Sequence, residues 1–275
     1  MYEQYRLCSR ENQPKLLTPA ALLWLMALTL GGIAIWTMHF VAMFSISIKD
    51  NDGNVLSVSY RLDYTFISLI AVIMLSYVGL RIGSSDQLFK SDKNDAVTKF
   101  TTDARNMTIK EIKAIKNIRI FLLSTLTRGL HVLLAGGLVT GGGVCVMHYV
   151  GMMAIVFDGT ISWNGGIVTA SVIIAVVAAT AAFWILYRLL SFFPKLEVLR
   201  IACSFVAALA VNGMHYTGQS AATFTYRANR VRDLGLSDSN LVPQSTATSA
   251  AIVIAVIICF VIFILALSDL RVWVR

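Results

Sequence analysis

Charged residues are scarce in this 275-residue sequence. They make up 14% of the chain, whereas hydrophobic residues make up 57%, and an average soluble domain carries about 25% charged residues. A water-soluble fold with so little charge would be hard to keep dispersed. The apolar residues are gathered in blocks of about 20, the length that matches the hydrocarbon core of a bilayer. The sequence therefore predicts a multi-pass integral membrane protein, which we expect in the plasma membrane.

Acidic residues and cysteines are also rare. The apolar blocks contain no glutamate, and aspartate occurs only at their edges, at Asp158 and Asp269. Proton-coupled transporters rely on intramembrane acidic residues or on broken helices near the midplane, so this kind of transport is disfavoured. Cys145, Cys203 and Cys259 all lie within the blocks, and no disulfide framework is indicated.

Six apolar blocks are present. Backbone polar groups must be satisfied internally in lipid, which favours helices, and the unbroken apolar runs do not alternate as the strands of a membrane barrel do. We therefore predict an all-α bundle of about six transmembrane helices within residues 19–270, after a polar tail of residues 1–18. The expected spans are 20–48, 64–82, 130–157, 166–190, 199–225 and 248–268.

The basic residues indicate the orientation of these spans. With a cytoplasmic N-terminus, 18 of the 23 Lys and Arg residues fall on the inner side and five on the outer side, in agreement with the positive-inside rule. We therefore expect both termini and the segment 83–129 in the cytoplasm. This topology, together with anionic inner-leaflet lipid, accounts for the net charge of +8, so no nucleic-acid partner is expected.

The segment 83–129 is too short to hold an enzyme domain, and we expect no enzyme. Within its stretch TIKEIKAIKNIRI, isoleucine recurs every third residue with Lys110, Lys113 and Lys116 between. The pattern is typical of an amphipathic helix on the inner membrane surface, although a solvated connector helix would show it too. We predict that these lysines contact lipid headgroups or a cytoplasmic signalling partner.

One motif occurs three times, as TMHFVAMF (37–44), VMHYVGMM (146–153) and GMHYTGQS (213–220). Each copy places a histidine after a methionine, before an aromatic ring and three residues before a small residue. Positions −7, −3, 0 and +4 share one helix face, and small residues on that face let a neighbouring helix approach. The three faces are Gly32, Trp36, His39 and Met43; Gly141, Cys145, His148 and Met152; and Ala208, Asn212, His215 and Gln219.

The three histidines are predicted to lie at one depth. The first, third and fifth spans run in the same direction, and each histidine precedes the expected outer end by nine to eleven residues, or about 14–16 Å. We expect the rings to face protein in the outer half of the bilayer. Ionisable residues inside a membrane are costly and usually functional.

Copper is the metal that this pattern favours. His39 with Met43 and His148 with Met152 are i,i+4 pairs, and imidazole with thioether sulfur suits cuprous copper. The third repeat is weaker because Gln219 replaces the sulfur. The methionines before the histidines point about 100° away and would serve only a site shared between helices; they are Met38, Met147 and Met214.

Two other interpretations stay open at this point. Two histidines on facing helices at one depth are also the arrangement that holds a haem axially, which would leave the methionines idle. Alternatively, the histidines are satisfied core residues and the methionines fill gaps in the packing.

The triple motif with its following Gly-Met resembles the MHYT domain, a membrane module named for this motif, over about residues 18–268. The resemblance implies a sensor that binds copper near the outer face and, through it, oxygen, carbon monoxide or nitric oxide. In bacteria the module is often fused to enzymes of cyclic-di-guanylate signalling. The implied ligand positions are Met38, His39, Met147, His148, Tyr149, Met214, His215 and Tyr216.

The sequence departs from that family in two places. Phe40 stands where the family has the first tyrosine, and only a polar tail precedes the first motif helix, where members usually have another helix. We expect a stand-alone member that acts as a sensor or redox module and signals through a partner. The alternatives are a transporter or channel for a metal ion, a proton or a small molecule, and a purely structural membrane subunit.

Overall fold

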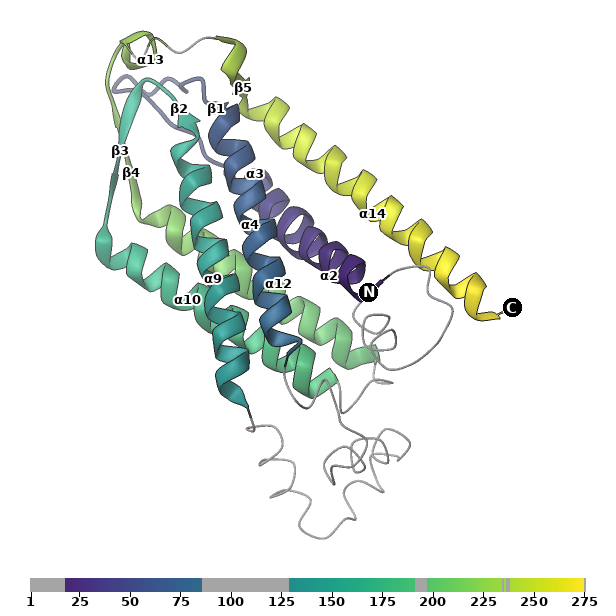
Figure 1. The fold of residues 1–275 in the computed structure, drawn as a ribbon. Coiled ribbons are helices and arrows are strands. Elements are labelled where there is room, and N and C mark those ends of the chain that lie inside the picture. The colour runs from purple at the N-terminus through teal and green to yellow at the C-terminus, as the bar shows by residue number, and fades with distance from the viewer. Residues whose placement is uncertain (1–17, 86–128, 191–196, 234, 236–237, 275) are drawn as a thin grey trace.

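The fold, taken from a computed structural model, is a bundle of helices that run alternately up and down (Figure 1). The structure describes residues 18–85, 129–190, 197–233, 235 and 238–274. The first helix is continuous from Pro19 to Met43 and comprises α2 (Pro19–Ala27), the π-helical η1 (Leu28–Thr37) and α3 (Met38–Met43). The other long helices are α4 (Leu62–Gly83), α9 (Leu130–Met153), α10 (Gly165–Trp184) with the π-helical turn η2 (Ile185–Leu189), α12 (Glu197–Ser220) and α14 (Gln244–Val274).

Within the described residues, five helices are long and apolar enough to cross a membrane, so the chain is a multi-pass membrane protein. They are Pro19–Met43, Leu62–Gly83, Leu130–Met153, Gly165–Leu189 and Gln244–Leu265. The sixth expected span, 199–225, falls mostly on α12. That helix has 24 residues, but polar side chains such as Asn212 and Gln219 make it less apolar than the five.

One end of the bundle carries short strands (Figure 1), and the prediction of an all-α fold is wrong there. β1 (Ser59–Arg61) pairs antiparallel with β2 (Ile155–Val156) and β5 (Leu241–Pro243). β3 (Gly159–Trp163) pairs antiparallel with β4 (Ala222–Tyr226). The short helices α13 (Arg230–Asp233) and η3 (Asp238–Asn240) lie between β4 and β5 in the chain. Each pairing joins segments far apart in sequence, so block hydropathy did not indicate it.

The strands shorten three of the predicted spans. The first helix ends at Met43, α9 at Met153 and α12 at Ser220, so each histidine precedes its helix end by only four or five residues. At 1.5 Å per residue this is about 6–8 Å, and the expected depth of 14–16 Å is wrong. The β4 sequence Ala-Thr-Phe-Thr-Tyr alternates apolar and polar residues, a strand pattern hidden inside an apolar block.

Three helices carry the histidines, and two others fill the grooves between them. α4 packs between the first helix and α9, while α10 packs between α9 and α12. The small residue predicted at Gly141 does allow close approach, because a Cβ atom there would lie 2.8 Å from the Cα atom of Val176 on α10. α14 is tied to the end of α3, where Gln244 Nε2 donates to the Met43 carbonyl (2.7 Å) and Thr248 Oγ1 to that of Phe40 (3.2 Å). These bonds satisfy carbonyls at a helix end.

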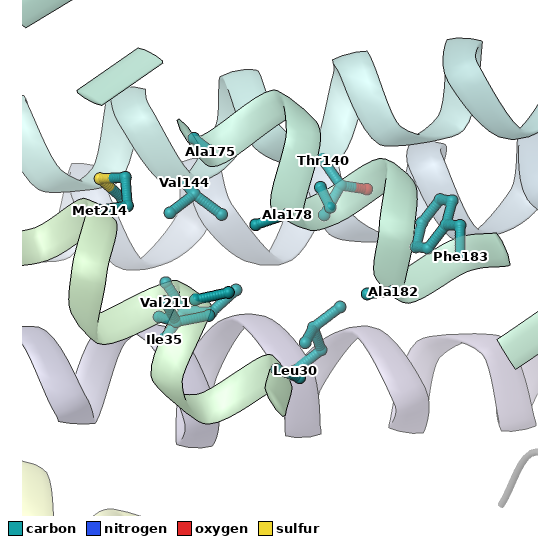
Figure 2. A pocket seen from close by; sticks show the side chains of 13 residues that line it. Leu30, Ile35, Thr140, Val144, Ala175, Ala178, Ala182, Phe183, Val211 and Met214 are labelled. Atoms are coloured by element: carbon teal, nitrogen blue, oxygen red, sulfur yellow. The ribbon is translucent and has the colours of Figure 1, made fainter. Parts of the chain in front are cut away.

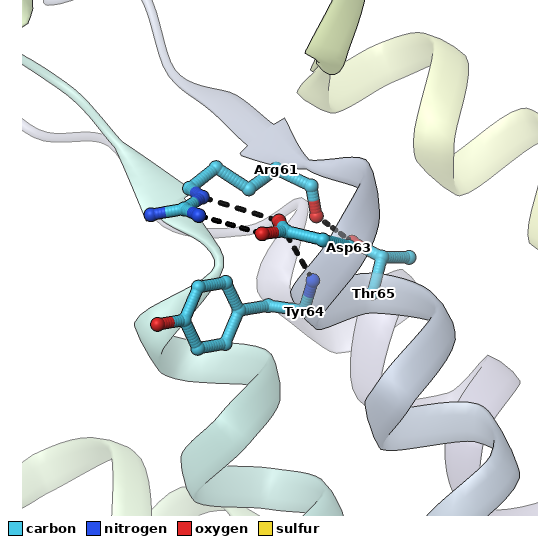
Figure 3. Close-up of polar contacts among 4 residues, drawn as sticks. All are labelled: Arg61, Asp63, Tyr64 and Thr65. Carbon is cyan, nitrogen blue, oxygen red and sulfur yellow. Dashed lines mark hydrogen bonds and ion pairs between the residues drawn. The ribbon is translucent and has the colours of Figure 1, made fainter. Parts of the chain in front are cut away.

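A polar turn begins α4 at the strand end of the bundle (Figure 3). Asp63 accepts from the Tyr64 backbone N–H (2.9 Å) and forms an ion pair with Arg61 at 2.6 Å, while Thr65 Oγ1 donates to the Arg61 carbonyl (2.7 Å). The guanidinium lies 4.5 Å from the Tyr64 ring centroid. The ion pair is solvent-exposed and contributes about 0–1 kcal/mol, so it helps to begin the helix without holding the bundle together.

The start of α2 and the end of α14 both lie away from the strands (Figure 1). The two ends of the described chain are therefore on the same side of the bundle. That this side is cytoplasmic stays a prediction. The tail 1–17 and the segment 86–128, which includes Lys110, Lys113 and Lys116, fall outside the described residues.

Candidate metal centre

His39 of α3, His148 of α9 and His215 of α12 meet inside the bundle. The ring centroids of every pair are 5.1 Å apart, and the ring planes are inclined by 83–89°. Ligand nitrogens from the three rings all lie within 4.8 Å of one another. The rings thus form an equilateral triangle, hereafter the histidine triangle, as expected for three histidines at one depth.

The histidine triangle is closed to solvent, with exposed fractions of 0%, 0% and 1% for the three residues. Nδ1 of His39 lies 3.2 Å from Nδ1 of His215. Nδ1 of His148 has no hydrogen-bond partner among the described residues. Each buried polar atom left without a partner costs about 1–3 kcal/mol. This cost indicates that the triangle is built to receive something that the nitrogens can bind.

Two glycines provide room for the histidine rings. A Cβ atom on Gly151 would lie 2.5 Å from Nε2 of His39, and one on Gly218 would lie 2.5 Å from Nε2 of His148. Each glycine follows the histidine of its own helix by three residues, so each ring rests on the neighbouring repeat. Ala42 holds the same position in the first repeat and is buried. With Nε2 against a glycine, Nδ1 is the atom left to face the centre.

The winding of the first helix sets the direction of His39. Over η1 the helix is π-helical, and Thr37 Oγ1 donates to the Gly32 carbonyl five residues earlier (3.1 Å). Such segments occur frequently at functional sites. The rotation of 100° per residue that placed Gly32 and Trp36 on the face of His39 therefore does not hold across η1. It does hold in α9 and α12, which are α-helical throughout.

One turn nearer the strands are Met43, Met152 and Gln219. Met43 and Met152 are fully buried, with exposed fractions of 1% and 0%. Gln219 is half-buried, and its Oε1 atom has no hydrogen-bond partner among the described residues. Helical register places these side chains over the histidine triangle. A ligand role for the two sulfur atoms stays a prediction.

The methionines before the histidines are not equivalent. Met147 and Met214 are fully buried in the core, whereas Met38 is only half-buried. Met214 lines an apolar cavity together with Val144 and Val211 (Figure 2). Its side chain packs in the core next to the histidine triangle, in the direction that a residue preceding a histidine should take.

The remaining candidates lie around the triangle. The Tyr149 hydroxyl is 2.6 Å from Ser171 Oγ on α10, and because Ser171 donates to the Val168 carbonyl, tyrosine is the donor. Tyr216 is 50% exposed. Asn212 donates to the Ala208 carbonyl of its own helix (2.8 Å), so its amide is occupied in local bonding.

Sequence analysis missed the residues that cover the triangle from the strand side. Phe40 is fully buried beside His39 and packs edge-to-face on Tyr60 of β1, with centroids 5.3 Å apart. Trp36 lies 4.8 Å from the Phe40 ring and donates to Ser68 Oγ (3.2 Å). Burial raises the pKa of the Tyr60 phenol. The aromatic position after the histidine was visible in the motif, but its partner comes from a strand that hydropathy did not reveal.

The fold and the site together define a multi-pass membrane protein with three buried histidines on three repeated helices. The family described as "Bacterial signalling protein N terminal repeat", MHYT, matches residues 32–91 and 141–196. The chain thus carries two MHYT repeats in tandem, with His39 in the first and His148 in the second, and the resemblance to this family is confirmed. The third motif lies outside both matched segments, yet its histidine completes the triangle.

Three curated proteins resemble the chain. The bifunctional diguanylate cyclase/cyclic di-GMP phosphodiesterase MucR of Pseudomonas aeruginosa is 28% identical over 70% of the chain and 22% of its own length. The signaling protein YkoW of Bacillus subtilis is 26% identical over 70% and 18%, and an uncharacterized signaling protein of Caulobacter vibrioides is 25% identical over 81% and 21%. The chain spans about a fifth of the length of these relatives. No solved structure matches it.

Proposed function

We propose that the chain is a membrane sensor or redox module that holds one copper ion between His39, His148 and His215. The observation that carries the proposal is the histidine triangle. Its three rings are fully buried, their nitrogens converge within 4.8 Å, and the Nδ1 atoms have no partner outside the triangle among the described residues. Metal–imidazole bonds of about 2.0–2.1 Å in a trigonal site require nitrogens about 3.5 Å apart, which small ring movements would supply.

The donor set favours copper. The group contains imidazoles and neither thiolate nor carboxylate, while the thioethers of Met43 and Met152 lie one turn away, and soft sulfur selects cuprous copper. When bound, copper supplies reversible one-electron chemistry and a coordination position for oxygen, carbon monoxide or nitric oxide. Haem is less favoured, because its axial nitrogens sit on opposite faces of a wide macrocycle. The 3.2 Å between Nδ1 of His39 and of His215 leaves no room for one.

The protein's own groups would position and shield the ion. The glycines at 151 and 218 hold two rings at fixed places, and Phe40 with Tyr60 covers the strand side. A signalling role fits the curated relatives, whose names describe signalling proteins or enzymes of cyclic di-GMP turnover, better than transport does. We further propose that the module sits in the plasma membrane and that the basic segment 83–129 contacts a cytoplasmic partner.

Elemental analysis of protein purified without chelators tests the metal. We expect about one copper per chain, and the double variant His39→Ala with His148→Ala should lose it. The matched control is His131→Ala, since His131 is exposed on α9 and outside the triangle. Folded wild-type protein without copper, or copper retained by the double variant, would contradict the proposal.

A flux assay separates sensing from transport. The protein reconstituted in liposomes that contain a copper-sensitive dye should let no copper pass. A measurable flux that His148→Ala abolishes would favour the transporter instead.

A further inference from the structure

An apolar cavity of about 70 Å³ lies on the side of the histidine triangle away from the strands (Figure 2). Ile35, Val144 and Val211 line it, and each of them precedes a histidine by four residues. The cavity therefore begins one residue layer from the triangle, and all three histidine-bearing helices contribute to its wall. The proposed copper site does not use it.

The lining of this cavity favours apolar occupants. Thr140 is the one polar residue among those that line it, and its hydroxyl faces α4, since a Cβ atom on Gly79 would meet Thr140 Oγ1. A water molecule needs two to four polar partners to stay in a cavity, and these walls do not offer them. An engineered apolar cavity of about 150 Å³ stays dry and binds benzene or xenon, so half that volume suits a molecule of two or three heavy atoms.

A second, larger cavity adjoins the first on its far side. It has a volume of about 480 Å³, and its walls include Arg200 and Ser204 near the start of α12. Leu30, Ala182, Phe183 and Ala207 line both cavities. The two spaces therefore meet at these residues and lead from the N-terminal end of α12 to the histidine triangle.

We propose that the smaller cavity, bounded by Ile35, Val144 and Val211, is a binding site for a small uncharged molecule such as a diatomic gas. The larger cavity is its entrance from the membrane, and Ala207 marks the junction. The occupancy depends only on the apolar walls. Delivery of a gas to copper rests on the proposed function, because it requires an ion in the histidine triangle.

Xenon is the probe, used on chelator-treated protein with labelled Ile, Leu and Val methyl groups in nanodiscs. We expect xenon to shift the methyl resonances of Val144 and Val211 saturably, while Val206, which is 55% exposed, shows only a linear shift from xenon dissolved in lipid. Ala207→Leu should abolish the saturable shift. Ala208→Leu is the matched control, because Ala208 is adjacent on α12 and exposed.

A second variant keeps the test decisive if Ala207→Leu fails to fold. Val211→Ala enlarges the cavity and should increase the shift at Val144. The proposal is overturned if the Val144 shift in the wild type is linear, or if folded Ala207→Leu retains it. Copper-loaded protein then tests delivery, where Ala207→Leu should slow carbon monoxide association and Ala208→Leu should not. Saturable xenon binding in protein that holds no copper would sink the proposed function alone.

Discussion

Nε2 of His39 on α3 occupies the space into which a side chain on Gly151 of α9 would project, and a Cβ atom there would lie only 2.5 Å away. Gly218 stands in the same relation to His148. The rings are therefore positioned by the absence of side chains on the next repeat. A change as small as one methyl group should move them.

Gly151→Ala should displace His39 and lower copper affinity by about 10- to 100-fold, the loss usual when a group that orients a metal ligand is altered. The control is Gly142→Ala on the same helix, where a Cβ atom meets nothing within 4 Å. Alanine in place of an open helical glycine stabilises by about 0.5–1 kcal/mol. Copper titration and thermal unfolding should thus move in opposite directions for the pair. Equal copper affinity in both variants would show that the glycine does not position the ring.

Met152→Leu should leave the fold intact, since volume-conserving core exchanges usually cost under about 1.5 kcal/mol. If the sulfur helps to hold the ion, the variant loses preference for cuprous over cupric copper, as measured by competition with chelators specific for each state. Met153→Leu is the control, because Met153 is 51% exposed. An unchanged preference in Met152→Leu would leave the histidines as the only ligands in this repeat.

Tyr149→Phe removes the hydroxyl that donates to Ser171 Oγ at 2.6 Å and should lower the free energy of unfolding by about 0.5–1.5 kcal/mol. Tyr216→Phe, at a half-exposed position, should change it little. Chemical unfolding in detergent measures both. Destabilisation of equal size in the two variants would mean that the motif tyrosine does not act by joining α9 to α10.

Alkaline pH should destabilise the protein through Tyr60. Burial raises the pKa of its phenol, whereas the unfolded phenol loses its proton near pH 10. The unfolded state therefore gains free energy by releasing a proton above about pH 10, and the stability that is present below this pH is lost as the pH rises. Tyr60→Phe should show a flatter dependence of unfolding temperature on pH between 9 and 11. A profile identical to that of the wild type would contradict this.

Much of the bundle could be read from the sequence. Blocks of apolar residues gave the five confirmed spans to within a few residues at most helix starts, because lipid requires long runs of apolar helix. The ends near the strands were misplaced at Met43, Met153 and Ser220. There, apolar strands continue an apolar helix, and composition does not distinguish the two.

The candidate site divides in the same way. Three copies of one motif at matching places in their helices were enough to predict that His39, His148 and His215 meet. The roles of their neighbours were less accessible. Asn212 bonds to its own helix and Tyr216 is exposed, whereas Tyr60 covers the site although no repeat includes it. Sequence spacing reports which residues share a helix face, and it does not report which segment from elsewhere covers that face.

By itself, the sequence determined that the chain crosses a membrane and that three imidazoles share one level, since hydropathy and helical period are local properties. Only the tertiary structure decided that the rings stand edge to face at 5.1 Å, rest on glycines and adjoin an apolar cavity. These features depend on how the backbones of separate helices approach one another. That approach is set by packing across the whole bundle, which no single segment of the chain encodes.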